Sequence, residues 1–272
     1  MTGDQEVAWF VSPNPGPLTL DGTRCYAVGR RHLVLVDPGP AIAGQIERLE
    51  SLVAGRSVET ICLTHAHSDH AGVAELASER FEAPIAASAE TLSRGNFSGR
   101  TLEGGDLLPV DDGASNLLAI RTPGHSADHM SYLLEPGRAV FTGDLVLGVG
   151  SSAILHPDGD VGSCLASFSR VLSLRPGRLY PGHGPPVDDG EGRLEHYRDH
   201  RIERHTQVAN AFHSGARMIE ELRMLVYGRL ESDLERAADA SIRAHLVHMR
   251  KCGDEVSTIA GLDDVTLLPE EA

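Results

Sequence analysis

The period of hydrophobic and polar positions changes once along the chain. Up to about residue 192, short apolar runs rich in β-branched residues alternate with amphipathic or alanine-rich stretches. The clearest apolar runs cover 25–28, 33–36 and 58–64, and the clearest helical stretches cover 42–53 and 71–82. Glycine and proline mark many of the junctions. The pattern therefore predicts interleaved strands and helices with turns at the strand ends, where binding and catalytic residues are commonly found.

Beyond about residue 192 the pattern becomes helical. Apolar residues recur at three- and four-residue spacing in three successive segments, 202–212, 218–225 and 234–249. Gly253 marks the expected end of the last helix, and two short runs, 255–259 and 265–268, predict a β-hairpin. Three helices followed by a hairpin are typical of a winged helix.

Composition and charge exclude several classes of protein. The 272 residues are 41% hydrophobic and 23% charged, which is unlike a disordered or collagen-like chain. No apolar run approaches the roughly 18 residues that a membrane span needs, and the first residues lack the features of a signal peptide. The four cysteines form neither a CxxC pair nor a disulfide framework. We expect a cytoplasmic protein with reduced thiols and no membrane partner.

The strongest chemical signal is the segment Thr64-His65-Ala66-His67-Ser68-Asp69-His70, which ends an apolar run. His65 and His67 are two residues apart in an extended chain and therefore point to the same side. Asp69 and His70 fall in the turn before the next helical stretch. Four side chains that can bind metals thus lie within six residues, which favours a metal site over a histidine-rich polar turn.

Three further candidate ligands follow other apolar runs. His125 stands in Thr-Pro-Gly-His-Ser, Asp144 ends Phe-Thr-Gly-Asp, and His183 stands in Pro-Gly-His-Gly. A single histidine or aspartate in a loop is more often a surface or turn residue. The shared position of these three at strand ends, together with the His65 segment, favours one common metal site.

The ordered set of His-x-His-x-Asp-His, a later Gly-His, a Gly-Asp and a final Gly-His resembles the metallo-β-lactamase superfamily. That resemblance implies an α+β fold, the αββα sandwich, in which seven such residues lie at one edge of the sheets. It implies that the first metal ion is bound by His65, His67 and His125, that the second is bound by Asp69, His70 and His183, and that Asp144 bridges the two.

A narrower resemblance is to the branch of β-lactamase-like protein 2, in which a winged helix follows the metal domain. The segments that carry it are 14–23, 125–130 and His200-Arg201. It implies a catalytic domain over 1–196 and a winged-helix domain over 197–272. One departure stands out, because Thr23-Arg24-Cys25 replaces the usual Thr-Asn-Thr. We expect Arg24 and Asn14 to contact the substrate, with Arg24 meeting an anionic group.

The implied ligands suggest a chemistry. Two divalent ions would share a water, lower its pKa and present a bridging hydroxide to an electrophilic carbonyl or phosphorus. Asp69 and Asp144 are the candidate catalytic residues, Asp69 by orienting the hydroxide. Imidazole mixed with carboxylate suits two Zn²⁺ ions best, with iron or manganese as alternatives. Asp128 is a candidate partner for a ligand histidine. We expect His129 to pack in the interior or to support the ligands, rather than to bind metal itself.

Three reactions are compatible with this ligand set. We prefer hydrolysis of a small acyl substrate, a thioester, ester or lactone. Single-strand endoribonuclease activity is the first alternative, because relatives with this pair of domains include such enzymes. Iron-dependent sulfur dioxygenase activity is the second. A non-catalytic binding protein would require a damaged ligand set, and all seven positions are intact. The chain could also form a homodimer.

Charge disfavours nucleic acid as a partner. The formal charge is −15, and residues 197–272 carry 10 basic against 14 acidic side chains. The expected hairpin has neither lysine nor arginine, although such side chains supply most non-specific affinity for phosphates. We therefore expect the C-terminal region to pack against the active site or cover it.

Overall fold

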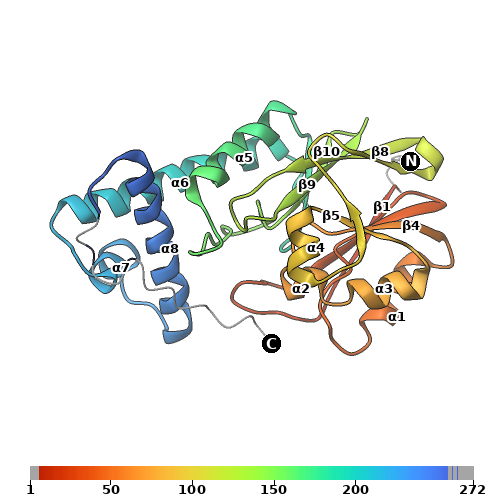
Figure 1. The fold of residues 1–272 in the computed structure, drawn as a ribbon, viewed down its shortest axis with the longest axis horizontal. Coiled ribbons are helices and arrows are strands. Elements are labelled where there is room, and N and C mark those ends of the chain that lie inside the picture. The colour runs from red at the N-terminus through yellow and green to blue at the C-terminus, as the bar shows by residue number, and fades with distance from the viewer. Residues whose placement is uncertain (1–5, 257–258, 260–261, 263–272) are drawn as a thin grey trace.

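Two β-sheets stacked face to face form one side of the molecule, and the C-terminal helices α7 (Ile219–Tyr227) and α8 (Ser232–Cys252) lie on the other (Figure 1). The computed structural model describes residues 6–256 together with 259 and 262. The first sheet has, in spatial order, β1 (Val7–Val11), β2 (Arg24–Val28), β3 (His32–Val36), β4 (Ser57–Cys62), β5 (Ile85–Ala87) and β6 (Gly99–Thr101). Pairing is antiparallel from β1 to β3 and parallel from β3 to β6.

The second sheet is mostly antiparallel. Its spatial order is β11 (Arg178–Pro181), β10 (Ala139–Gly143), β9 (Met130–Glu135), β8 (Ser115–Arg121) and β7 (Leu107–Val110). A short 3₁₀ helix at Asp111–Gly113 joins β7 to β8. Only the β10–β11 pair is parallel, because α5 (Val161–Ser173) lies between these two strands in sequence.

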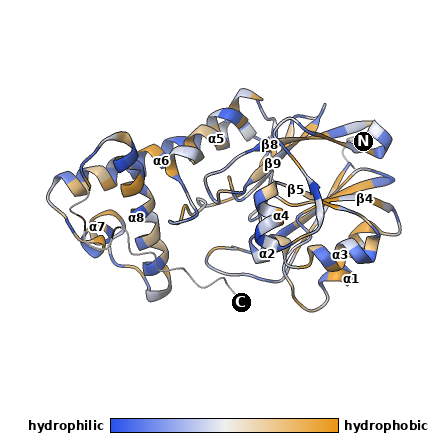
Figure 2. Ribbon diagram, in the orientation of Figure 1, coloured by the Kyte–Doolittle hydropathy of each residue, from blue (hydrophilic) through white to orange (hydrophobic). Residues whose placement is uncertain are grey.

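Alternation along the strands builds three layers of apolar contact. In β2, Tyr26 and Val28 face the second sheet, while Cys25 and Ala27 face the helices on the other side. Both sets are buried, since α1 (Gln45–Val53) and α3 (Ala74–Phe81) cover the first sheet. Figure 2 shows hydrophobic and hydrophilic residues mixed along these helices, as expected where one face packs on a sheet. The second sheet is covered by α5 and the first half of α6 (Gly190–His213).

A helical region follows the sandwich. The second half of α6 packs with α7 and α8 around their own apolar cluster. One helix therefore belongs to both parts, and the expected boundary between residues 196 and 197 falls inside it. The division into two domains stays a prediction.

The α+β sandwich and the C-terminal helical region are confirmed. The expected apolar runs correspond to β2, β3 and β4, and the expected helices to α1 and α3. Two short helices, α2 (Ser68–Ala71) and α4 (Ala89–Gly95), follow β4 and β5. The expected hairpin lies largely outside the described residues, so the winged helix stays a prediction. No helix among the described residues combines the length and apolarity needed to cross a membrane.

Candidate metal centre

All seven expected ligands lie at one edge of the sandwich, in segments that follow four strands. His65 and His67 come after β4, and Asp69 and His70 begin α2. The other three follow β8, β10 and β11 respectively: His125, Asp144 and His183. The topology therefore brings together residues that are more than a hundred positions apart in the chain.

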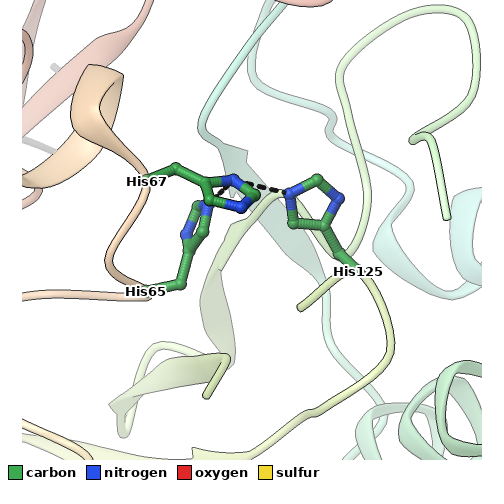
Figure 3. A group of neighbouring side chains, drawn as sticks. All are labelled: His65, His67 and His125. Carbon is green, nitrogen blue, oxygen red and sulfur yellow. Dashed lines mark hydrogen bonds between the residues drawn. The ribbon is translucent and has the colours of Figure 1, made fainter. Parts of the chain in front are cut away.

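His65, His67 and His125 form one compact group. Figure 3 shows the three rings pointing toward one another from two separate loops. His67 Nδ1 lies 2.9 Å from His65 Nε2 and 3.1 Å from His125 Nε2. The opposite nitrogens have other partners, since His65 Nδ1 lies 2.9 Å from Thr64 Oγ1 and His125 Nδ1 lies 2.9 Å from the Ala153 carbonyl. Both Nε2 atoms are thereby aimed at the centre of the group.

Asp69, His70 and His183 form a second group beside the first. Asp69 Oδ2 lies 3.1 Å from His183 Nε2 and 3.4 Å from His70 Nε2, and the two Nε2 atoms are 3.3 Å apart. A tetrahedral zinc ion with nitrogen ligands at its usual bond lengths separates them by about 3.3 Å. The spacing in both groups is close to this value.

The Asp144 carboxylate faces both groups. Its Oδ2 lies 3.4 Å from His183 Nε2 and 3.7 Å from His125 Nε2, and its Oδ1 lies 3.4 Å from His70 Nε2. Asp144 Oδ1 is buried and has no hydrogen-bond partner in the described part of the chain. A buried carboxylate oxygen that accepts no hydrogen bond is costly, and a cation between the groups would compensate for that loss.

Gly182 leaves the space that this arrangement needs. A Cβ at that position would lie 2.5 Å from His70 Cε1 and 2.6 Å from Asp144 Oδ1. Five imidazoles and two carboxylates are a donor set suited to zinc, iron or manganese. The described residues therefore fit two divalent metal ions held side by side.

The two groups differ in electrostatics. Burial and the neighbouring histidines hold the pKa of His65 well below its usual value and lower that of His67 to about 4. For His70, burial acts in the same direction, but Asp69, Asp144 and Asp37 outweigh it and raise its pKa well above the usual value. Against the same effect of burial, Asp144 and Asp69 raise the pKa of His183 to about 10. At neutral pH His65 and His67 are therefore available to a metal without losing protons, whereas His70 and His183 hold protons that a metal must displace.

Asp37 is the main supporting residue that sequence reasoning missed. Its Oδ1 accepts a hydrogen bond from Thr64 N at 2.7 Å, and its Oδ2 accepts from Thr64 Oγ1 at 2.7 Å and from His70 Nδ1 at 2.8 Å. It thus fixes His70 directly and His65 through Thr64. The sequence did carry a signal for it: Asp37 directly follows the apolar run 33–36. The Pro-Gly after Asp37 indicates a turn at the end of that run.

Asp128 and His129 also support the site from behind the ligands. Asp128 Oδ2 accepts from Ala66 N and from Thr91 Oγ1, each at 2.9 Å, so it holds the backbone between His65 and His67. His129 Nε2 accepts from Asp144 N at 3.1 Å. Asp128 therefore binds backbone rather than a ligand ring, and His129 holds the main chain of Asp144 from outside the two groups.

Asn14 and Arg24 lie beside the site without lining its cavity. Asn14 bonds to both Thr23 N and Thr23 Oγ1, and Thr23 Oγ1 donates to Asp69 Oδ2 at 3.2 Å. The buried Arg24 guanidinium donates two hydrogen bonds to Asp21, whose Oδ1 also accepts from Gly184 N. The structure therefore gives no support to a substrate contact by either residue and connects both with the loops that carry Asp69 and His183.

A cavity of about 720 Å³ is lined by five of the seven expected ligands, His67, Asp69, His125, Asp144 and His183. Its apolar walls are formed by Pro17, Leu18, Leu20, Phe97, Leu147, Val149, Leu155 and Pro157. Arg94 is the single arginine or lysine of the described residues that lines it, and its guanidinium donates two hydrogen bonds to Asp158. The last residue along the sequence that lines the cavity is His183. No described residue of the C-terminal helical region therefore borders it.

Comparison with known proteins gives consistent matches. The family model described as the metallo-beta-lactamase superfamily matches residues 18–183. The beta-lactamase-like protein 2 homolog of Caenorhabditis elegans is 33% identical over 210 residues, covering 74% of this chain and 69% of the relative. The lactamase-like protein aptB of Emericella nidulans is 30% identical over 273 residues, covering 94% of this chain and 85% of the relative.

A solved structure extends the match to the whole fold. The beta-lactamase domain protein from Burkholderia ambifaria superposes with a TM-score of 0.83 at 20% identity, covering 93% of this chain and 88% of that one. Its coverage includes the C-terminal helical region as well as the sandwich.

Proposed function

The chain belongs to the metallo-beta-lactamase superfamily, and from that premise we propose that it is a dinuclear metal-dependent hydrolase of small acyl substrates, namely thioesters, esters or lactones. The observation that carries the proposal is the Asp144 carboxylate, which lies within 3.7 Å of histidines from both ligand groups at the floor of an apolar cavity. Hydrolysis of a thioester in such a site adds water across the carbon–sulfur bond and releases a carboxylic acid and a thiol.

The residues of this chain would hold two metal ions and position them. His65, His67 and His125 would hold one ion, the group of Asp69, His70 and His183 would hold the other, and Asp144 would contact both. When bound, such a pair of ions supplies an activated water at neutral pH and polarises the oxygen under attack. No serine or cysteine nucleophile is required.

Asp69 has the position expected of a residue that orients the attacking water. Its Oδ2 accepts from Thr23 Oγ1 at 3.2 Å, and its carboxylate borders the cavity. Although burial opposes it, the charge of His70 lowers the pKa of Asp69 to about 2, so its carboxylate stays ionised at neutral pH. An ionised carboxylate can accept a hydrogen bond from water while binding a metal.

The walls of the cavity favour an acyl substrate over RNA. They are largely apolar, which suits the hydrocarbon part of an acyl group. The arginine that lines the cavity is occupied by Asp158, so among the described lining residues there is no free cation for a phosphodiester backbone.

A panel of substrates tests the proposal. Zinc-loaded protein is assayed on acyl thioesters, esters, lactones and single-stranded RNA, and iron-loaded protein on a persulfide with oxygen. We expect one acyl class to be cleaved at a rate at least about 100-fold above that of the Asp144→Ala variant. RNA cleavage at a matching rate, or turnover only with iron and persulfide, would contradict the acyl assignment.

A further inference from the structure

Arg201 is a buried cation without an acidic partner in the described structure. It lies on α6, which runs from the second sheet to α7 and α8 (Figure 1), and it is only 4% exposed. Its Nε has no hydrogen-bond partner. Arg223, similarly buried in the helical region, forms ion pairs with Glu235 and Asp239. Burial of an unpaired charge is costly, so a specific contact has to account for Arg201.

The contact that Arg201 does make leads to the metal centre. Its Nη2 donates to the Ser152 carbonyl at 2.6 Å. The Ser152 hydroxyl in turn donates to the Asp144 carbonyl and lies 3.3 Å from His125 Nδ1. Ser152 thus connects Arg201 with the ring of His125 and with the main chain of Asp144.

Other contacts from α6 and α8 hold the same segment. Arg193 of α6 donates to the carbonyls of Leu147 and Gly150, and the backbone of α8 accepts a hydrogen bond from His156 N at Ala240. Residues 147–157 form one wall of the cavity. The C-terminal helices therefore lie outside the cavity but fix a wall that they do not line.

We propose that Arg201 is a positioning residue for the metal centre, acting through Ser152 on His125 and Asp144. This rests on the proposed function in so far as these two residues bind metal. The expected effect is on metal affinity, because partners that orient ligands typically change it about 10- to 100-fold. Folding stability should respond differently. Replacing Arg201 with an apolar side chain of similar length removes a buried, unpaired charge, so the stability of the folded state should stay the same or rise.

The test is a titration of metal-free protein with Zn²⁺ against a competing chelator, together with thermal unfolding of the metal-free form. Arg201→Met should raise the Kd for Zn²⁺ about 10- to 100-fold while leaving Tm unchanged or higher. Arg201→Lys, which can still donate to the Ser152 carbonyl, should recover most of the affinity. Ser152→Ala keeps the carbonyl that Arg201 bonds but removes the hydroxyl that contacts the Asp144 carbonyl and His125 Nδ1, so it tests the second half of the link and should also lower the affinity. If Arg201→Met does not fold, Arg201→Gln, which is shorter and uncharged, takes its place.

Arg204→Met is the matched control on the same helix. Arg204 also donates to a carbonyl, that of Val226, and stacks on Tyr227, away from the cavity. Its replacement should lower Tm without changing Zn²⁺ affinity. Wild-type affinity in either Arg201→Met or Ser152→Ala, or an equal loss in Arg204→Met, would overturn the proposal. Because Zn²⁺ binding is measured directly, a failure to find an acyl substrate would contradict the proposed reaction and leave this result intact.

Discussion

Asp144 faces both ligand groups, so its replacement should affect both metal ions. We expect Asp144→Ala to abolish hydrolysis, with a loss of at least about 100-fold, and to lower the metal content per chain. Metal analysis and the acyl assay measure the two effects. Asp188→Ala, at a carboxylate with 86% of its side chain exposed, is the control and should match the wild type. Full activity in Asp144→Ala would refute the assignment of this residue.

The pKa values of the histidines are shifted in opposite directions in the two groups, so the binding of the two ions should depend differently on pH. His65 and His67 have lowered pKa values and bind the first ion without releasing protons at pH 7. His70 and His183 have raised pKa values and must lose protons to the solvent when the second ion binds. Affinity for the second ion should therefore fall more steeply as pH decreases from 8 to 6.

Calorimetry of Zn²⁺ binding in buffers of different ionisation enthalpy measures this proton release. We expect the second binding step to depend on the buffer more strongly than the first. Equal proton release in both steps would contradict the assignment of protons to His70 and His183.

Spacing in the sequence predicted the ligand candidates and gave Asp128 and His129 as candidate supporting residues, but it did not indicate Asp37. The motif around His65 and the three strand-end residues carry their signal locally. Asp37 acts on His70 and Thr64 because β3 pairs in parallel with β4, and no local pattern reveals which strands are neighbours. Arg24 was expected to contact the substrate, whereas its partner Asp21, three residues earlier, occupies its guanidinium.

At the level of elements, strand ends determine where the ligands stand. β11 ends at Pro181, and Gly182 and His183 follow at once. We expect Gly182→Ala to disturb His70 and Asp144 together, because the added methyl group would lie 2.5 Å and 2.6 Å from their atoms. The result should be loss of the second ion and at least about a 100-fold fall in activity, measured by metal analysis and assay.

Gly177→Ala, just before the other end of the same strand, is the control for this substitution. A Cβ there would meet only the Arg138 carbonyl, at 4.0 Å. This variant should keep both ions and full activity. If Gly182→Ala also kept both ions, the close packing of the metal ligands around residue 182 would be wrong.

The long apolar and helical patterns predicted the main elements because their period is set by burial on one face. The short strands β5 and β6 escaped the sequence reading, since three residues carry no measurable period. The boundary between the two expected domains was drawn where the pattern changes, yet α6 continues through it, because one half of this helix packs on the second sheet and the other half on α7 and α8.

At the scale of the whole molecule, the negative charge and the metal centre have to be considered together. The formal charge is −15, and both Asp69 and Asp144 belong to the metal centre instead of the open surface. Two divalent ions would make this edge of the sandwich a positive site in an acidic protein. Such a distribution favours anionic or polarisable small substrates at the cavity over a nucleic-acid backbone spread across the surface.

We propose that the seven residues hold two adjacent metal ions and that Asp144 contacts both. The most direct measurement is anomalous diffraction at the zinc edge from crystals of zinc-loaded protein. We expect two anomalous peaks about 3.5–4 Å apart, one among His65, His67 and His125 and one beside Asp69, His70 and His183, with the Asp144 carboxylate touching both. A single peak, or peaks away from these residues, would contradict the account.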